Sequence, residues 1–246
     1  MSFPLLRLPD LALEEIIKFC DHQEILFLVQ TSQRVRRLIS RHTKSHRIKI
    51  KVIDQKFSSS VEILCDHQET FRIVRDTYYG DLRWKFQSLM KVRKPLEFIW
   101  KREDPMLQGV VDFLMEIFRI EEVSFKIEQS SYCQAVLVLE NCVSKNLKIG
   151  SVEWLTCSGS DEMARKFLML SKGATKLNFK KLASLDFKFD HFHLFRMDHL
   201  RIDNATWITA EQVVALRNCK RIDLGFVLFH EPFTTKILRE YLENPG

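Results

Sequence analysis

The sequence has little glycine and lacks the motifs by which several classes of enzyme bind their substrates or metals. Only 7 of its 246 residues are glycine, less than half of the usual share of about 7%. Glycine-rich loops that hold phosphate groups are therefore disfavoured. No nucleotide-binding, nucleophile-elbow or zinc-protease motif is present. We therefore expect no catalytic activity and no cofactor.

The cysteines and the apolar runs also exclude several classes of protein. The six cysteines include no CxxC pair, which argues against a zinc cluster or a redox pair. No stretch approaches the roughly 20 apolar residues that span a bilayer, and no secretory signal is visible. We expect a reducing compartment, the cytoplasm or the nucleus, and no membrane partner. His191 and His193 beside Asp190 are the best candidate metal ligands, but no fourth ligand is placed, so we predict no metal site.

Acidic residues are absent between Glu24 and Asp54, where eight lysines and arginines occur. Residues 1–51 hold ten basic and five acidic residues, and the rest of the chain is close to neutral. This asymmetry predicts a separate N-terminal module. The basic stretch could contact nucleic acid or act as a nuclear address. It lacks interleaved aromatic residues, so we favour a solvated face, or one that faces an acidic partner.

Three short helices are predicted in this module. Apolar residues spaced by three and four after Pro9 predict a helix of about three turns. A second apolar helix is expected near 25–29, and Thr31 and Ser32 can cap a third over 33–41. So few residues make a small core, which packs on the rest of the chain or completes itself against a partner.

The same residues resemble an F-box over roughly residues 5–42. The resemblance is carried by Leu8-Pro9-x3-Leu13-x2-Ile16-Ile17 and Glu24-Ile25-Leu26-x2-Val29-x-Thr31-Ser32-x2-Val35-Arg36-x-Leu38. Val35 departs from the pattern, because many F-boxes have Trp there. The resemblance implies a Skp-type adaptor as partner and, indirectly, a cullin. The implied adaptor-binding residues are Leu8, Pro9, Leu13, Ile17, Ile25, Leu26, Val29 and Ser32. Each could equally belong to the core of a helical hairpin.

Strands and helices then alternate through the rest of the chain. Apolar patterns predict strands at 47–52, 61–64, 71–74, 96–100 and 123–127, with helices after Pro105 and near 133–143. We therefore predict an α+β protein. A three-helix module over 1–45 is followed by an α/β domain over 46–246.

A weak repeat occurs in the last hundred residues. Leu155, Leu177, Leu200 and Ile222 lie 22, 23 and 22 residues apart, each in a short strand-like element. Helical stretches at 160–170 and 209–217 lie between them. This spacing predicts degenerate units similar to leucine-rich repeats. Four loosely spaced strands could also arise by chance in an α/β domain.

The repeat predicts a substrate-binding face. If the leucines point inward, their neighbours point outward and align across parallel strands. The predicted column is Thr156, Asn178, Arg201 and Asp223, flanked by Trp154, Lys176, Lys180, His199, Asp203 and Arg221. From these we predict the substrate-binding residues Trp154, Thr156, Lys176, Asn178, Arg201, Asp203, Arg221 and Asp223. Ordinary solvated strand positions would give the same pattern.

A second resemblance concerns residues from about 150 to 246. It is carried by Asn204-Ala205-Thr206-Trp207-Ile208-Thr209-Ala210-Glu211 and Leu216-x-Asn218-Cys219-Lys220-Arg221-Ile222-Asp223-Leu224. These strings are similar to the type 2 F-box-associated domain of the nematode F-box B group. The two resemblances together imply a substrate-recognition subunit of a Skp-cullin-F-box E3 ubiquitin ligase, with a protein substrate bound by the C-terminal domain. The alternative is a repeat-type scaffold or nucleic-acid-binding protein unrelated to ubiquitin.

Overall fold

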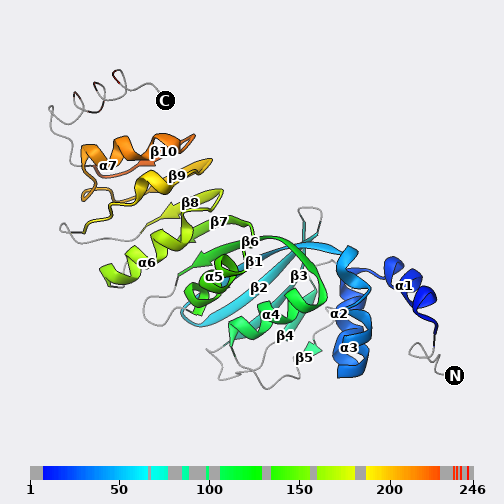
Figure 1. Ribbon diagram of the computed structural model, residues 1–246. Helices are drawn as coiled ribbons and strands as arrows, with labels where there is room; N and C mark the ends of the chain where they lie inside the picture. The colour runs from blue at the N-terminus through cyan, green and yellow to red at the C-terminus, as the bar shows by residue number, and fades with distance from the viewer. Residues whose placement is uncertain are drawn as a thin grey trace. The chain divides into compact units, whose positions relative to one another are not determined.

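The structure is a computed structural model of the chain (Figure 1). It describes residues 8–65, 68–76, 85–88, 98–99, 106–128, 134–155, 160–180, 187–227, and the single positions 235, 237, 239 and 243. The chain forms two compact units, the first from residues 1–51 and 57–122 and the second from 52–56 and 123–246. The predicted F-box boundary near residue 45 does not separate these units and stays a prediction.

The first unit begins with three helices, as predicted: α1 (Asp10–Phe19), α2 (His22–Thr31) and α3 (Gln33–Ile39). Side-chain caps fix where the second and third begin. The Asp21 carboxylate accepts a hydrogen bond from the Glu24 amide at 2.7 Å, and the Glu24 carboxylate accepts one from the Asp21 amide at 2.9 Å. The Ser32 hydroxyl accepts a hydrogen bond from the Val35 amide. Such caps satisfy amides that have no partner within the helix.

Five strands follow in the first half of the chain. They are β1 (Arg47–Asp54), β2 (Ser58–Cys65), β3 (Gln68–Asp76), β4 (Lys85–Ser88) and β5 (Phe98–Ile99), adjacent in that order. The pairs from β2 to β5 are antiparallel. A short helical turn, η2 (Thr43–Ser45), precedes β1, and α4 (Leu107–Ile117) contacts β2. Alternate residues of β1 are buried, as the sequence pattern predicts.

The second unit is built on parallel strands in chain order. These are β6 (Arg119–Ile127, from Val123 on), β7 (Ile149–Trp154), β8 (Lys176–Phe179), β9 (His199–Ile202) and β10 (Ile222–Leu224). Helices α5 (Gln134–Ser144), α6 (Asp161–Ser171) and α7 (Ala210–Ala215) connect them. Crossovers between parallel strands are nearly always right-handed. Because the strands follow chain order, the helices collect on one face of the sheet (Figure 1). The predicted α+β class is confirmed.

Phenylalanine side chains fill the described part of the connection between β8 and β9. The described part of this connection, residues 187–198, holds only a short turn, η3 (Phe192–Leu194). The rings of Phe187, Phe189, Phe192 and Phe195 are buried there. The Phe187 ring meets the Trp207 ring edge to face, with centroids 4.6 Å apart. Four aromatic rings thus occupy the layer that α5, α6 and α7 fill elsewhere. A second turn, η4 (Leu216–Asn218), completes this layer before β10.

The register of the sheet corrects one part of the predicted repeat. Val152, not Leu155, aligns with Leu177, and Leu177 aligns with Leu200. Val152 is fully buried, whereas Leu155 follows the end of β7 and is half-buried. The first unit of the repeat is therefore 25 residues long rather than 22. The nearly equal spacing from Leu155 to Leu177 and onward in the sequence led to the shorter length predicted for the first unit.

Candidate functional site

Most of the predicted adaptor-binding residues form the core of the helical module. Leu13 and Ile17 on α1 and Ile25, Leu26 and Val29 on α2 are all buried. Their side chains pack inside the module, so they support its surface and do not form it. Their place at or near the adaptor interface stays a prediction. The remaining three lie elsewhere: Leu8 is half-buried and Pro9 exposed before α1, and Ser32 caps α3.

Other apolar side chains face outward from the same helices. Leu11 is 79% exposed and Phe19 is 87% exposed on α1, together with Ile16, and Phe27 is exposed on α2. At about 100° of rotation per residue, Leu11 and Phe19 lie about 160° and about 120° from Leu13 around the helix, and Ile16 lies about 60° from it, at the edge of the buried side. We call Leu11, Ile16, Phe19 and Phe27 the α1–α2 surface. The apolar spacing after Pro9 places Leu11 and Ile16 in the expected buried stripe, yet both are exposed, whereas Phe19 and Phe27 lie outside that spacing.

The connector after α3 anchors the helical module to α4. The Thr43 hydroxyl donates a short hydrogen bond to the carbonyl of Ile117, and both groups are buried. The Lys44 ammonium donates to the carbonyls of Met115 and Glu116, each at 2.9 Å. These three carbonyls lie at the end of α4, where helical carbonyls have no partner within the helix. The connector therefore completes the helix and fixes the module to it.

Further polar contacts extend this anchor. The Arg36 guanidinium lies 3.1 Å from the Glu116 carboxylate, and Arg47 lies 3.2 Å from Glu121. Burial lowers the pKa of the Lys44 ammonium, although the Glu116 charge opposes this. Three of the eight residues of the basic stretch are therefore held by contacts within the first unit. This weakens the nucleic-acid interpretation of that stretch.

We expect Thr43→Val to cost about 1–3 kcal/mol of the free energy of unfolding, because the buried Ile117 carbonyl loses its donor. Thr31→Val is the matched control, since the exposed Thr31 hydroxyl also donates to a helical carbonyl, that of Leu28. Its cost should stay within about 0.5 kcal/mol. Urea unfolding followed by circular dichroism measures both. If both variants unfold at the same urea concentration, the hydrogen bond from Thr43 contributes no more to stability than the exposed one from Thr31.

The outer face of the parallel sheet carries polar side chains in rows across the strands. The register places Lys126, Glu153, Asn178, Arg201 and Asp223 side by side, and we call this set the central row. Lys176 and His199 are aligned one step toward the amino ends of the strands, where Arg221 lies beside His199. Glu153 thus holds the position predicted for Thr156, which lies outside the described residues. The other predicted positions on β8–β10 do share this face.

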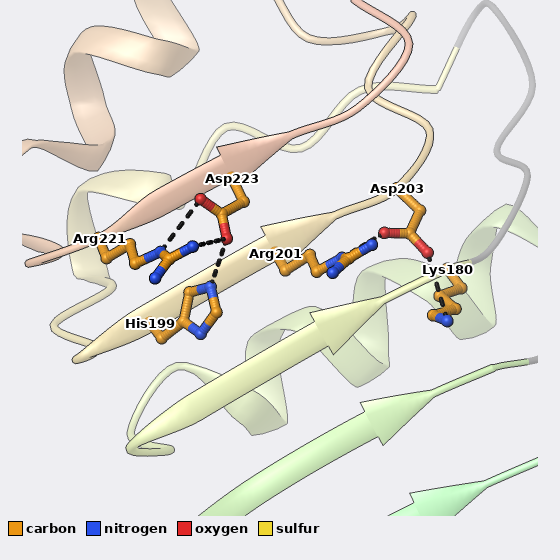
Figure 2. Close-up of polar contacts among 6 residues, drawn as sticks. All are labelled: Lys180, His199, Arg201, Asp203, Arg221 and Asp223. Carbon is orange, nitrogen blue, oxygen red and sulfur yellow. Dashed lines mark hydrogen bonds and ion pairs between the residues drawn. The ribbon is translucent and has the colours of Figure 1, made fainter.

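Ion pairs link neighbouring strands on this face (Figure 2). The Asp203 carboxylate lies 2.6 Å from Arg201 and 3.6 Å from Lys180. The Asp223 carboxylate lies 2.7 Å from the ring of His199 and 3.1 Å from Arg221. Hydrogen bonds from Arg221, and then from His199, lower the pKa of Asp223. The side chains are thereby held in place across β8, β9 and β10.

Trp154 does not belong to this face, which corrects the prediction. Its side chain is only 2% exposed and lies edge to face on Phe167, with ring centroids 4.2 Å apart. It is in register with Phe179, which is also buried. Because side chains alternate along a strand, Trp154 points to the same side as Val152. The predicted repeat assumed that Leu155 points into the core, so it placed Trp154 on the opposite, outer side.

We expect Trp154→Ala to cost about 3–5 kcal/mol, the usual range for removing a buried large aromatic residue. Trp154→Phe should cost less than about 1.5 kcal/mol, because among the described residues the indole N–H has no hydrogen-bond partner to lose. Lys176→Ala, on the outer face, should change stability by less than about 0.5 kcal/mol. Thermal unfolding of the three variants checks this order. If Trp154→Ala is as stable as wild type, the Trp154 side chain is not buried and the predicted outer position is restored.

In the described ranges, no three His, Cys, Asp or Glu side chains are grouped so that they could hold a metal ion. Within the same ranges, no helix has the length and apolar character needed to cross a membrane.

Comparison with known proteins identifies the helical module. The family model of the F-box domain matches residues 5–47, which contain α1, α2, α3 and the anchoring connector. A Caenorhabditis elegans protein, "Skn-1 dependent zygotic transcript 15 protein", is 22% identical over 272 residues, covering 100% of this chain and 77% of that protein. No solved structure matches the chain. The chain therefore has an F-box domain at residues 5–47. The type 2 F-box-associated domain and the B group stay predictions.

Proposed function

We propose that this chain is a substrate-recognition subunit of a Skp-cullin-F-box E3 ubiquitin ligase. F-box domains bind a Skp-type adaptor, and the match at residues 5–47 is the observation that carries the proposal. In this proposal the F-box domain contacts the adaptor and the parallel sheet of the second unit contacts a protein substrate. F-box proteins are generally non-catalytic, so ubiquitin transfer belongs to the other subunits of the ligase.

The α1–α2 surface supports the first half of this proposal. Leu11 and Phe19 remain in water although the module has a buried core of its own. Burying a Leu or Phe side chain contributes about 1.5–3 kcal/mol, so a partner that covers both gains substantially. Leu8 and Pro9 precede α1 immediately and extend the same end of the module. We place the adaptor on these residues, with Leu13 and Ile17 supporting them from behind.

The outer face of the parallel sheet supports the second half. Parallel sheets normally have both faces covered and read as continuous apolar strands. Here β8 and β9 instead alternate between buried and polar residues. Strand–helix units of 22–25 residues with one open strand face are typical of leucine-rich repeats, which commonly bind proteins on such a face. Asn178, Arg201 and their neighbours are the substrate-contacting residues in this proposal.

Replacing Leu11 and Phe19 together with Asp should abolish adaptor binding, because truncating a hot spot costs at least about 2 kcal/mol, a thirtyfold loss in affinity per site. Leu137→Asp is the control, since Leu137 is an exposed apolar residue on α5 of the second unit. Isothermal titration with a purified Skp-type adaptor measures the affinities. We expect wild type and the control to bind equally and the double variant to show no heat.

Two other results would count against the proposal. If wild type forms no complex with the adaptor, the ligase role falls and the scaffold alternative takes its place. If the double variant binds as well as wild type while its circular dichroism is unchanged, the adaptor contacts lie elsewhere on the F-box domain.

A further inference from the structure

Positive charge is concentrated at the amino ends of strands β7 to β10. Lys176 is the first residue of β8, His199 is the first residue of β9, and Arg221 directly precedes β10. Lys148 directly precedes β7, and Lys220 precedes Arg221. Lys176, Lys220 and Arg221 are exposed. We call these five residues the amino-end cluster.

The nearby carboxylates do not balance this charge. Asp198 lies 2.7 Å from Lys220, and its pKa is lowered first by that contact and further by the charges of Lys176 and Lys148. Asp223 is shared between Arg221 and His199. Within the described residues, these two carboxylates face three permanent cations, Lys176, Lys220 and Arg221.

Lys176 is the cation that the cluster leaves unpaired. Within the described part of the chain, its ammonium forms no ion pair or hydrogen bond, although it lies close enough to affect Asp198. Lys176 also lies beside His199 in the register of the sheet. Its side chain is therefore available to a ligand at the middle of the cluster.

Among the described residues, the rest of the outer face is balanced. Arg201 and Lys180 share Asp203, Lys126 lies 2.7 Å from Glu128, and Glu153 supplies a third carboxylate for these three cations. The surplus of positive charge is therefore confined to one edge of the face. Solubility depends on net charge and not on where the charges lie. Solubility alone therefore does not explain why the positive charge is gathered at one edge.

We propose that the amino-end cluster binds an acidic segment of a protein partner, an extended stretch rich in Asp and Glu that lies across the strands. This inference rests on the proposed partner-binding function of the sheet and names the chemistry of that partner. Neighbouring strands lie about 4.8 Å apart, so Lys176, His199 and Arg221 span about 10 Å. The side chains of about three extended residues cover that distance. Arg221 can hold a carboxylate with two parallel hydrogen bonds, whereas Lys176 acts as a point charge.

The central row favours an acidic peptide over a nucleic acid. Glu153 lies in that row, one side-chain repeat or about 6.6 Å further along the strands. A phosphate backbone longer than the cluster would meet this carboxylate and be repelled. A short acidic segment ends within the cluster.

Fluorescence polarisation of a labelled oligoglutamate peptide, titrated with the full chain, tests this proposal. We expect Lys176→Glu combined with Arg221→Glu to weaken binding more than tenfold, because like charges placed in contact are strongly unfavourable. Lys176→Gln combined with Arg221→Gln should give an intermediate loss. Raising NaCl from about 0.1 M to about 1 M shortens the Debye length from about 10 Å to about 3 Å and should also weaken binding.

The control variant carries the same change in net charge on other exposed lysines of the second unit. Lys172→Glu combined with Lys188→Glu should leave peptide binding within twofold of wild type. Thermal unfolding establishes that each variant is folded. The proposal is overturned if the wild-type chain does not bind the peptide, or if the control loses as much affinity as the cluster variant. It is also overturned if duplex DNA binds more tightly than the peptide and depends on the same two residues.

This experiment is independent of the adaptor. Failure of the peptide to bind, with adaptor binding intact, removes only the acidic-segment inference and leaves the ligase role. Failure of adaptor binding, with the peptide bound through Lys176 and Arg221, removes the ligase role and leaves a protein-interaction site.

Discussion

The carbonyl groups that end helix α4 are the feature on which the first unit depends. A helix leaves its last carbonyls without internal partners, and here Thr43 and Lys44 supply donors from the connector that follows the F-box helices. The connector leads directly into β1, so the contacts that complete α4 also fix where the sheet begins. The F-box helices therefore belong to the same compact unit as β2, β3 and α4. A subunit that must hold its adaptor in a defined orientation gains from such an anchor.

The parallel sheet of the second unit has one covered, apolar face and one polar face. Helices and the phenylalanine cluster cover one side, where Trp154, Phe167 and Phe179 pack together. On the other side, ion pairs between neighbouring strands, His199 with Asp223 and Lys180 with Asp203, hold polar side chains in rows. The strands thus fix the spacing of the charges. A partner that binds this face would find the charged side chains already in position, which lowers the entropic cost of binding.

Much of the fold could be predicted from the sequence because the apolar periodicity is strong and local. The helix α1 follows from apolar spacings of three and four, and the strand β1 follows from strict alternation. Ser32 and Thr209 mark where α3 and α7 begin. The short strand β4 was not predicted.

The register of the parallel strands was harder to predict than the elements themselves, because it depends on which residues the helices bury. Val152 and Leu155 are equally plausible as leucine-repeat positions until Trp154 is seen to pack on Phe167. The adaptor-binding residues stay a prediction, because a buried stripe and a binding surface are both apolar and sequence alone does not say which side faces the protein. Leu11 lies in the apolar spacing of α1 and yet is exposed, whereas Phe19 lies outside that spacing, so the sequence offered a signal for Phe19 alone of these two.

The central claim is that the F-box domain binds its adaptor through outward apolar residues of α1 and α2. Hydroxyl-radical footprinting of the chain with and without a Skp-type adaptor measures this directly, because it reports the exposure of individual side chains. The account predicts that Leu11, Phe19 and Phe27 become protected in the complex. Phe226, which is 81% exposed in the second unit, should stay as reactive as before. Unchanged reactivity of Phe19 in a complex that has demonstrably formed would contradict the claim.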